Sequence, residues 1–113
     1  MDSTQIDRSA LKRLLAVLGN DPAELEDLLT DYCEDAPDLA RRISDAAGSG
    51  DMDALRIAAH TLKSNAHDFG ARHLSALCAD LERACISGVP ADPKASAEQI
   101  VGAEKAAREA VAL

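Results

Sequence analysis

The sequence predicts an all-α fold, namely an antiparallel, up-and-down four-helix bundle preceded by one additional short helix. Leu and Ala supply most of the apolar content and β-branched residues are scarce, a balance that favours helix over sheet. Apolar residues recur at the i, i+3, i+4 and i+7 positions of amphipathic helices in successive segments. Short connections between the longer segments favour antiparallel neighbours. The length of 113 residues fits a single domain that spans residues 1–113.

The first predicted helix runs from about residue 7 to residue 18. Its apolar stripe consists of Leu11, Leu14, Leu15 and Leu18. Gly19 and Asn20 follow, and both residue types tolerate the left-handed conformation in which many helices end. We expect this short helix to lie against the bundle.

The second predicted helix extends from about residue 22 to residue 47. Asp21 precedes it as an N-cap, and Pro22 suits its first position. The apolar repeat keeps its phase across Pro37, so we predict one long helix that is kinked where the proline removes a backbone hydrogen bond. The alternative is two shorter helices that separate near Asp35.

Three further helices complete the predicted bundle. They are expected over residues 52–68, 71–87 and 93–111. Asp51 caps the first of them, and Gly70 marks either the junction between the first and the second or a point of close backbone approach. The last helix is rich in alanine, and Glu104 falls inside its apolar stripe.

Composition argues against several classes of function. The formal net charge is -8, with 20 acidic residues against 12 Lys and Arg, so a nucleic-acid partner is not expected. No segment approaches the ~20 apolar residues of a membrane span, and the N-terminus lacks the pattern of a signal peptide. Cys33, Cys78 and Cys85 contain no CxxC pair, and we interpret them as reduced thiols of a cytoplasmic protein.

Motifs of a self-contained enzyme are missing from the sequence. There is no glycine-rich phosphate loop, no GxSxG and no HExxH. His60 and His67 lie two turns apart on one predicted helix, too far to share a metal ion, and His73 does not complete a ligand set. We therefore expect no metal site and no cofactor bound by this chain.

His60 is the main candidate for chemistry. It lies on the exposed face of the predicted helix over residues 52–68, with Lys63 one turn further on. The opposite, core-facing stripe contains Leu55, Ala59, Leu62, Ala66 and Phe69. A nucleophile on the exposed side of a rigid helix suits a group that is presented to another protein. Spacing alone leaves open the alternative that His60 is an ordinary surface residue.

The residues around His60 resemble the signature of the histidine-containing phosphotransfer (HPt) domain. That signature reads Ala-His-x-Leu-Lys-small, then apolar-Gly-Ala, then Leu, Cys and Leu-Glu at helical spacing. The matching residues are Gly50-Asp51, Ala59-His60-Thr61-Leu62-Lys63-Ser64, Phe69-Gly70-Ala71, Leu74, Cys78 and Leu81-Glu82. The family often has Gly where this chain has Ser64, and a small side chain there leaves room for an incoming partner.

The resemblance implies a phosphorelay intermediate that carries a phosphoryl group on His60 between receiver domains, without binding or cleaving ATP. Imidazole is a competent nucleophile near neutral pH, because its reference pKa is about 6.5. Lys63 would offset charge on the phosphoryl oxygens. Ala59 and Leu62 would hold the helix in the core, and Gly70 would let Phe69 and the next helix pack closely.

The resemblance also implies partners. These are response-regulator receiver domains, which would supply Mg²⁺, and a hybrid histidine kinase, while the protein itself is expected to be a monomer. The residues expected to face a receiver are Arg56, Ile57, Ser64 and His67, with Arg41 and Arg42 on the second helix. The alternatives for His67 are a second acceptor, a phosphate contact and an ordinary exposed residue, and we favour the last because nothing around it repeats the Leu-Lys-small context. His73 is expected at the surface.

Other functions are compatible with a helical bundle. The dimerisation domain of a histidine kinase normally has an acidic residue after its phosphorylated histidine and a proline soon afterwards. Here Thr61 follows His60, and the next proline is Pro90. A helical adaptor without phosphoryl chemistry would tolerate the substitution of His60 with Gln. A metal-binding bundle is the third alternative.

Overall fold

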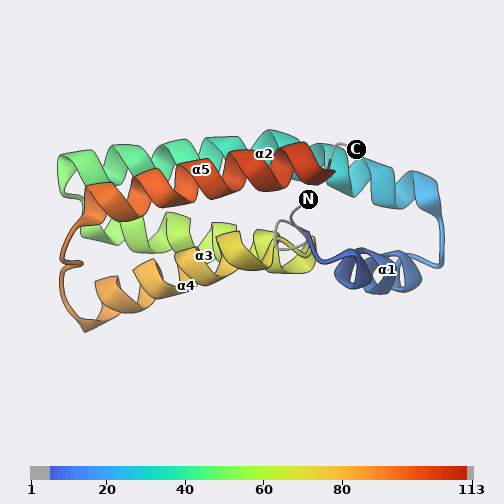
Figure 1. Ribbon diagram of the computed structural model, residues 1–113, viewed down its shortest axis with the longest axis horizontal. Helices are drawn as coiled ribbons and strands as arrows, with labels where there is room; N and C mark the ends of the chain where they lie inside the picture. Colours follow the sequence, from blue (N-terminus) through green and yellow to red (C-terminus); the bar gives the residue numbers. More distant parts are fainter. Residues whose placement is uncertain (1–5, 112–113) are drawn as a thin grey trace.

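The computed structural model describes residues 6–111, and within that range it contains five α-helices and no strand (Figure 1). The helices are α1 (Arg8–Val17), α2 (Pro22–Ser49), α3 (Met52–Asp68), α4 (Arg72–Ser87) and α5 (Pro93–Val111). The all-α prediction is confirmed, and the helix ends lie close to the predicted ones.

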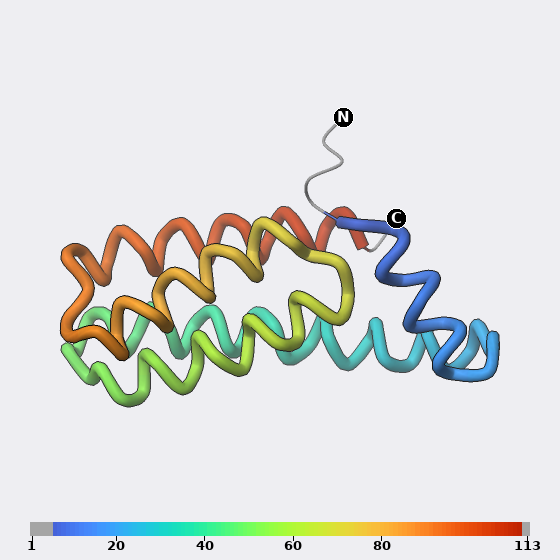
Figure 2. Tube along the Cα trace, turned by 90° about the horizontal axis from the view of Figure 1, so that it is seen from below, coloured from blue at the N-terminus to red at the C-terminus, as the bar shows by residue number. Residues whose placement is uncertain are grey.

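The four long helices form the up-and-down bundle. Each runs antiparallel to the one before it, as Figures 1 and 2 show. α2 packs against α3 and α5, and α4 packs against the same two helices, which closes the bundle. The molecule is elongated, with extents of 42 × 27 × 21 Å.

The short helix α1 packs at one end of the bundle. It contacts α2 and α3. Figure 2 shows that it runs across the long axis, beyond the ends of α3 and α4 and beside the part of α2 that projects past them. The additional N-terminal helix was predicted correctly, and it lies across the end of the bundle.

α2 is one continuous helix through Pro37. Asp21 caps it by accepting a hydrogen bond from the amide of Ala23 at 3.0 Å, and Gly50 ends it with a φ of 77°. Of the two alternatives for this segment, the single long helix is therefore correct. The bend at Pro37 stays a prediction.

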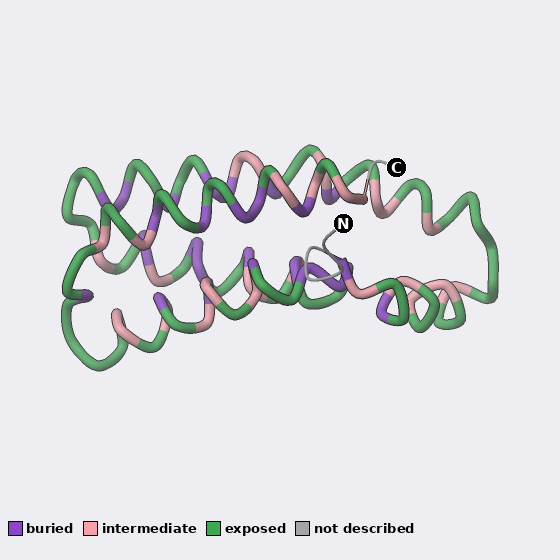
Figure 3. Tube along the Cα trace, viewed as in Figure 1, coloured by how far each residue is buried: buried purple, intermediate pink, exposed green. Residues whose placement is uncertain are grey.

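The core lies between the inward faces of the long helices (Figure 3). The largest fully buried side chains are Ile43, Leu55, Leu62, Leu74, Cys78 and Ile100. Many of the other buried residues are alanines, which allow helix backbones to approach closely. Glu104 is also buried, and its carboxylate accepts a hydrogen bond from Arg108 Nε at 2.9 Å. This pairing explains how a charged residue is tolerated in the stripe of α5.

Gly70, between α3 and α4, is a point of close backbone approach, which is one of the two alternatives that the sequence predicted. Its φ is 79°, and a Cβ there would lie 2.4 Å from the backbone oxygen of Asp7. The amide of Asp7 donates to the carbonyl of Gly70 at 2.6 Å, and its carboxylate pairs with Arg72 at 2.8 Å. Gly70 therefore admits the segment before α1. The close contact of Gly70 is with that segment, and its implied role in the packing of Phe69 on the next helix stays a prediction.

Gly70→Ala should lower the free energy of unfolding by roughly 1–3 kcal/mol, because left-handed strain is added to a backbone clash. Gly48→Ala is the matched control, since Gly48 lies within α2 and a Cβ there meets nothing within 4 Å. The control should raise the stability by up to about 1 kcal/mol. Urea denaturation followed by circular dichroism measures both, and equal effects would contradict this role of Gly70.

Candidate functional site

His60 projects into solvent from the middle of α3. Its side chain is 57% exposed. Ala59 and Leu62 are completely buried and hold α3 against the rest of the bundle. His60 thus lies on the exposed face of a helix whose opposite face is packed in the core.

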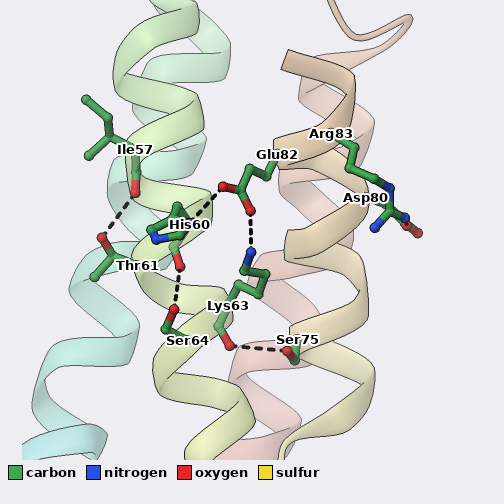
Figure 4. Close-up of polar contacts among 9 residues, drawn as sticks. All are labelled: Ile57, His60, Thr61, Lys63, Ser64, Ser75, Asp80, Glu82 and Arg83. Carbon is green, nitrogen blue, oxygen red and sulfur yellow. Dashed lines mark hydrogen bonds and ion pairs between the residues drawn. The ribbon is translucent and has the colours of Figure 1, made fainter. Parts of the chain in front are cut away.

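Glu82 of α4 connects His60 with Lys63 (Figure 4). Its Oε2 lies 2.7 Å from His60 Nδ1, and its Oε1 accepts a hydrogen bond from Lys63 Nζ at 2.6 Å. The Glu82 side chain is only 13% exposed, whereas that of Lys63 is 31% exposed. One carboxylate between α3 and α4 therefore holds both candidate side chains of α3.

The contact with Glu82 determines which ring nitrogen of His60 carries the proton. An ionised carboxylate accepts hydrogen bonds and cannot donate them. Nδ1 of His60 must therefore be the protonated nitrogen that donates to Glu82. In the neutral ring, Nε2 then keeps its lone pair. This nitrogen lies on the side of the ring away from Nδ1, where an exposed imidazole can react with a partner.

The charges around Glu82 keep it ionised. The hydrogen bond from Lys63 lowers the pKa of this carboxyl below its ordinary value. Partial burial acts in the opposite direction, and the hydrogen bond with His60 adds to the lowering. Glu82 therefore remains an acceptor near neutral pH, which the proton arrangement on His60 requires.

Arg56 and Ile57 lie on two different sides of His60. Arg56 is half-buried and lies on the side of α4, near Cys85. Burial raises the pKa of the Cys85 thiol, and the positive charge of Arg56 opposes that rise. Ile57 is 55% exposed on the side of α2. The structure thus places both residues one turn before His60, with Ile57 toward α2 and Arg56 toward α4.

A groove between α2 and α3 begins beside His60. Its lining includes Leu39, Arg42, Ala46, Ile57, Ala58 and Thr61. Arg42 pairs with Asp38 at 3.0 Å, and Arg41 pairs with the same carboxylate. Of the two arginines that the sequence suggested for a partner surface, Arg42 lines this groove together with Ile57.

Ser64 and His67 differ in their relation to His60. Ser64 is exposed one turn further along α3, and its Oγ donates to the carbonyl of His60 at 3.3 Å. His67 lines a shallow pocket with Arg13, Leu14 and Val17 of α1. The structure therefore brings Ser64 into the site, whereas His67 faces the surroundings of α1. His73 is exposed on α4.

Two further properties concern the part of the chain that the structure describes. Within residues 6–111, no three His, Cys, Asp or Glu side chains gather in a way that would hold a metal ion. No helix among these residues is long and apolar enough to cross a membrane.

Glu82 is the site residue to which sequence reasoning assigned no role. It follows His60 by 22 residues and Lys63 by 19. Only the antiparallel packing of α3 and α4 brings the three together. The available signal was the Leu81-Glu82 pair in the resemblance, because Glu82 follows a core residue and must lie at the edge of the α4 stripe.

Comparisons with known proteins agree with this geometry. A family model described as the Hpt domain matches residues 27–112. The crystal structure of histidine-containing phosphotransfer protein B (HptB) from Pseudomonas aeruginosa PAO1 is similar over 98% of this chain and 94% of that chain, with 26% sequence identity and a TM-score of 0.87. A comparison with curated proteins gave no significant match. Because the family model covers most of the sequence, the chain belongs to the Hpt domain family, the phosphotransfer intermediates of two-component signalling.

Proposed function

We propose that this protein accepts a phosphoryl group on His60 from the aspartyl phosphate of one receiver domain and passes it to another. The observation that carries the proposal is the bridge from Glu82 to His60 Nδ1 and Lys63 Nζ. It supports an unprotonated Nε2 on an exposed helix face, with an ammonium group one turn away.

The transfer needs no base on this chain. Nε2 of His60 attacks the phosphorus atom, and the new N–P bond forms as the bond from phosphorus to the aspartate oxygen breaks. The electron pair of the broken bond leaves with the aspartate carboxylate. The proton on Nδ1 stays in place, and the positive charge that the ring gains is stabilised by the carboxylate of Glu82. Transfer to the second receiver is the same step in reverse.

Lys63 is proposed to offset the negative charge on the phosphoryl oxygens. Its ammonium is held near His60 by the 2.6 Å bond to Glu82, so little reorganisation is needed when the phosphoryl group arrives. The receiver is expected to supply Mg²⁺, and this chain is proposed to bind neither a cofactor nor ATP. A cytoplasmic location and a monomeric state stay predictions.

The receiver is proposed to dock over α3 and the adjoining groove between α2 and α3. Ile57 supplies exposed apolar surface at the edge of that groove, and Arg42 supplies a cation that complements an anionic phosphoaspartate site. Ser64 leaves space for the partner because its side chain is small. A hybrid histidine kinase would use the same face through its own receiver.

Incubation with a receiver charged by acetyl phosphate should add one acid-labile, alkali-stable phosphoryl group to the wild-type protein. Intact-mass analysis before and after acid treatment measures this gain. His60→Gln should abolish it, whereas His67→Gln, which alters the histidine beside α1, should leave it intact. If neither the wild type nor the variants take up phosphoryl groups from a panel of receivers, the adaptor interpretation is favoured.

Glu82→Gln should reduce stability near neutral pH but not in acid. The lowered pKa means that the ionised carboxylate stabilises the folded state above the ordinary value of 4.5 and loses this effect as the pH falls through the folded-state pKa. We expect a difference of about 1 kcal/mol at neutral pH that shrinks towards zero in acid. Urea denaturation at several pH values measures it. Asp80→Asn, an exposed change on the same helix, should alter stability less, and a pH-independent Glu82 effect would contradict the bridge.

Ile57→Asp should weaken receiver binding roughly tenfold or more, because it places a charge in the apolar part of the proposed docking surface. Val101→Asp is the matched control, since Val101 is 39% exposed on α5, which packs against α2 and α4. Isothermal titration calorimetry with the receiver that charges His60 measures both variants. Equal losses would place the docking surface elsewhere.

A further inference from the structure

We infer that Ser75 is a positioning residue whose hydroxyl fixes the register between α3 and α4 and so places Glu82 against His60 and Lys63. The inference rests on the proposed function, since it concerns how the same site is kept in its reactive geometry. Ser75 belongs to α4, and it touches neither ring nitrogen of His60.

The contact of Ser75 crosses between helices. Its Oγ donates to the backbone carbonyl of Lys63 at 3.1 Å, over a separation of 12 residues (Figure 4). The hydroxyls of Thr30, Thr61, Ser64 and Ser87, in contrast, donate to a carbonyl four residues earlier in their own helix. The hydrogen bond of Ser75 therefore connects two helices, whereas each of those bonds lies within a single helix.

Two positions on α4 form hydrogen bonds with Lys63. Ser75 binds its backbone carbonyl, and Glu82 binds its Nζ. The two α4 residues are seven positions apart, so they share a face at a separation of about 10 Å along the helix axis. The contact of Ser75 fixes where the backbone of α3 lies along α4. The contact of Glu82 with Lys63 Nζ depends on that position.

Apolar packing alone does not define this register so closely. Between the two polar contacts, α4 buries Cys78 and Leu81, and the burial of apolar side chains is non-directional. A hydrogen bond depends on distance and angle. Sliding one helix by a single residue, about 1.5 Å, would break the Ser75 bond and move Glu82 away from His60 Nδ1.

The loss of the hydroxyl should affect the site more than the fold. Inside a helix, a carbonyl also accepts the amide four residues further on, so the carbonyl of Lys63 keeps a partner when Ser75 is replaced by Ala. The apolar residues of α4 remain in place. The main consequence is greater freedom of α4 along α3, which weakens the contact that holds the proton on His60 Nδ1.

Ser75→Ala in the full chain tests the inference with two readouts. The ¹⁵N chemical shifts of the His60 ring report which nitrogen is protonated, without any receiver present. We expect protonated Nδ1 in the wild type and a shift towards protonated Nε2 in the variant. The rate of phosphoryl uptake should fall roughly tenfold. This is less than the ~100-fold loss of rate that a misplacement of the reacting groups by about 1 Å can cause. Ser87→Ala, which removes a hydroxyl bonded within α4, should match the wild type in both readouts.

Two results would overturn the role of Ser75. One is a Ser75→Ala protein whose His60 ring shifts and uptake rate equal those of the wild type. The other is an equal change in Ser87→Ala, which would show that any hydroxyl loss on α4 perturbs the site. If the ring shifts change in Ser75→Ala alone while no receiver charges the wild type, the positioning role is supported and the phosphorelay proposal fails.

Discussion

The carboxylate of Glu82, shared between His60 and Lys63, is the interaction on which the rest of the site depends. It accepts from His60 Nδ1 and from Lys63 Nζ at distances below 2.8 Å. These distances require α3 and α4 to keep one antiparallel register. The connection through Gly70 fixes one end of that pair, and the bond from Ser75 to the Lys63 backbone lies between this end and Glu82. The fold therefore serves the site by aligning two helices.

The value of this interaction lies in orientation more than in stability. Ion pairs that water reaches contribute little to folding, and His60 is more than half exposed. Stability comes from the apolar face of the same helix, where Ala59 and Leu62 are completely buried. α3 thus contributes to stability through its buried face and orients His60 on its exposed face. The core can be packed tightly while the exposed face keeps the His60 ring accessible to solvent.

Local signals predicted most of the fold. Asp21 and Asp51 act as N-caps, as their residue types indicated, whereas α2 continues to Ser49 and ends at Gly50 in the left-handed conformation. The helical repeat also placed His60 outside and Leu62 inside. It determines which face a residue occupies, but not how far one helix is shifted along another. Glu82 and Gly70 contact residues that are distant in the sequence. His67 lies beside α1, although helical spacing predicts that it shares the face of His60.

The same arrangement explains how one histidine can both receive and release a phosphoryl group under the proposed function. The negative charge of Glu82 stabilises the positive ring that phosphorylation creates, which favours loading. That charge also lies near the phosphoryl oxygens and repels them, which favours unloading. Lys63 reduces this repulsion, because its ammonium sits beside the same carboxylate. Under the proposed function, Glu82 therefore acts in both directions, and its pairing with Lys63 moderates the effect that favours unloading.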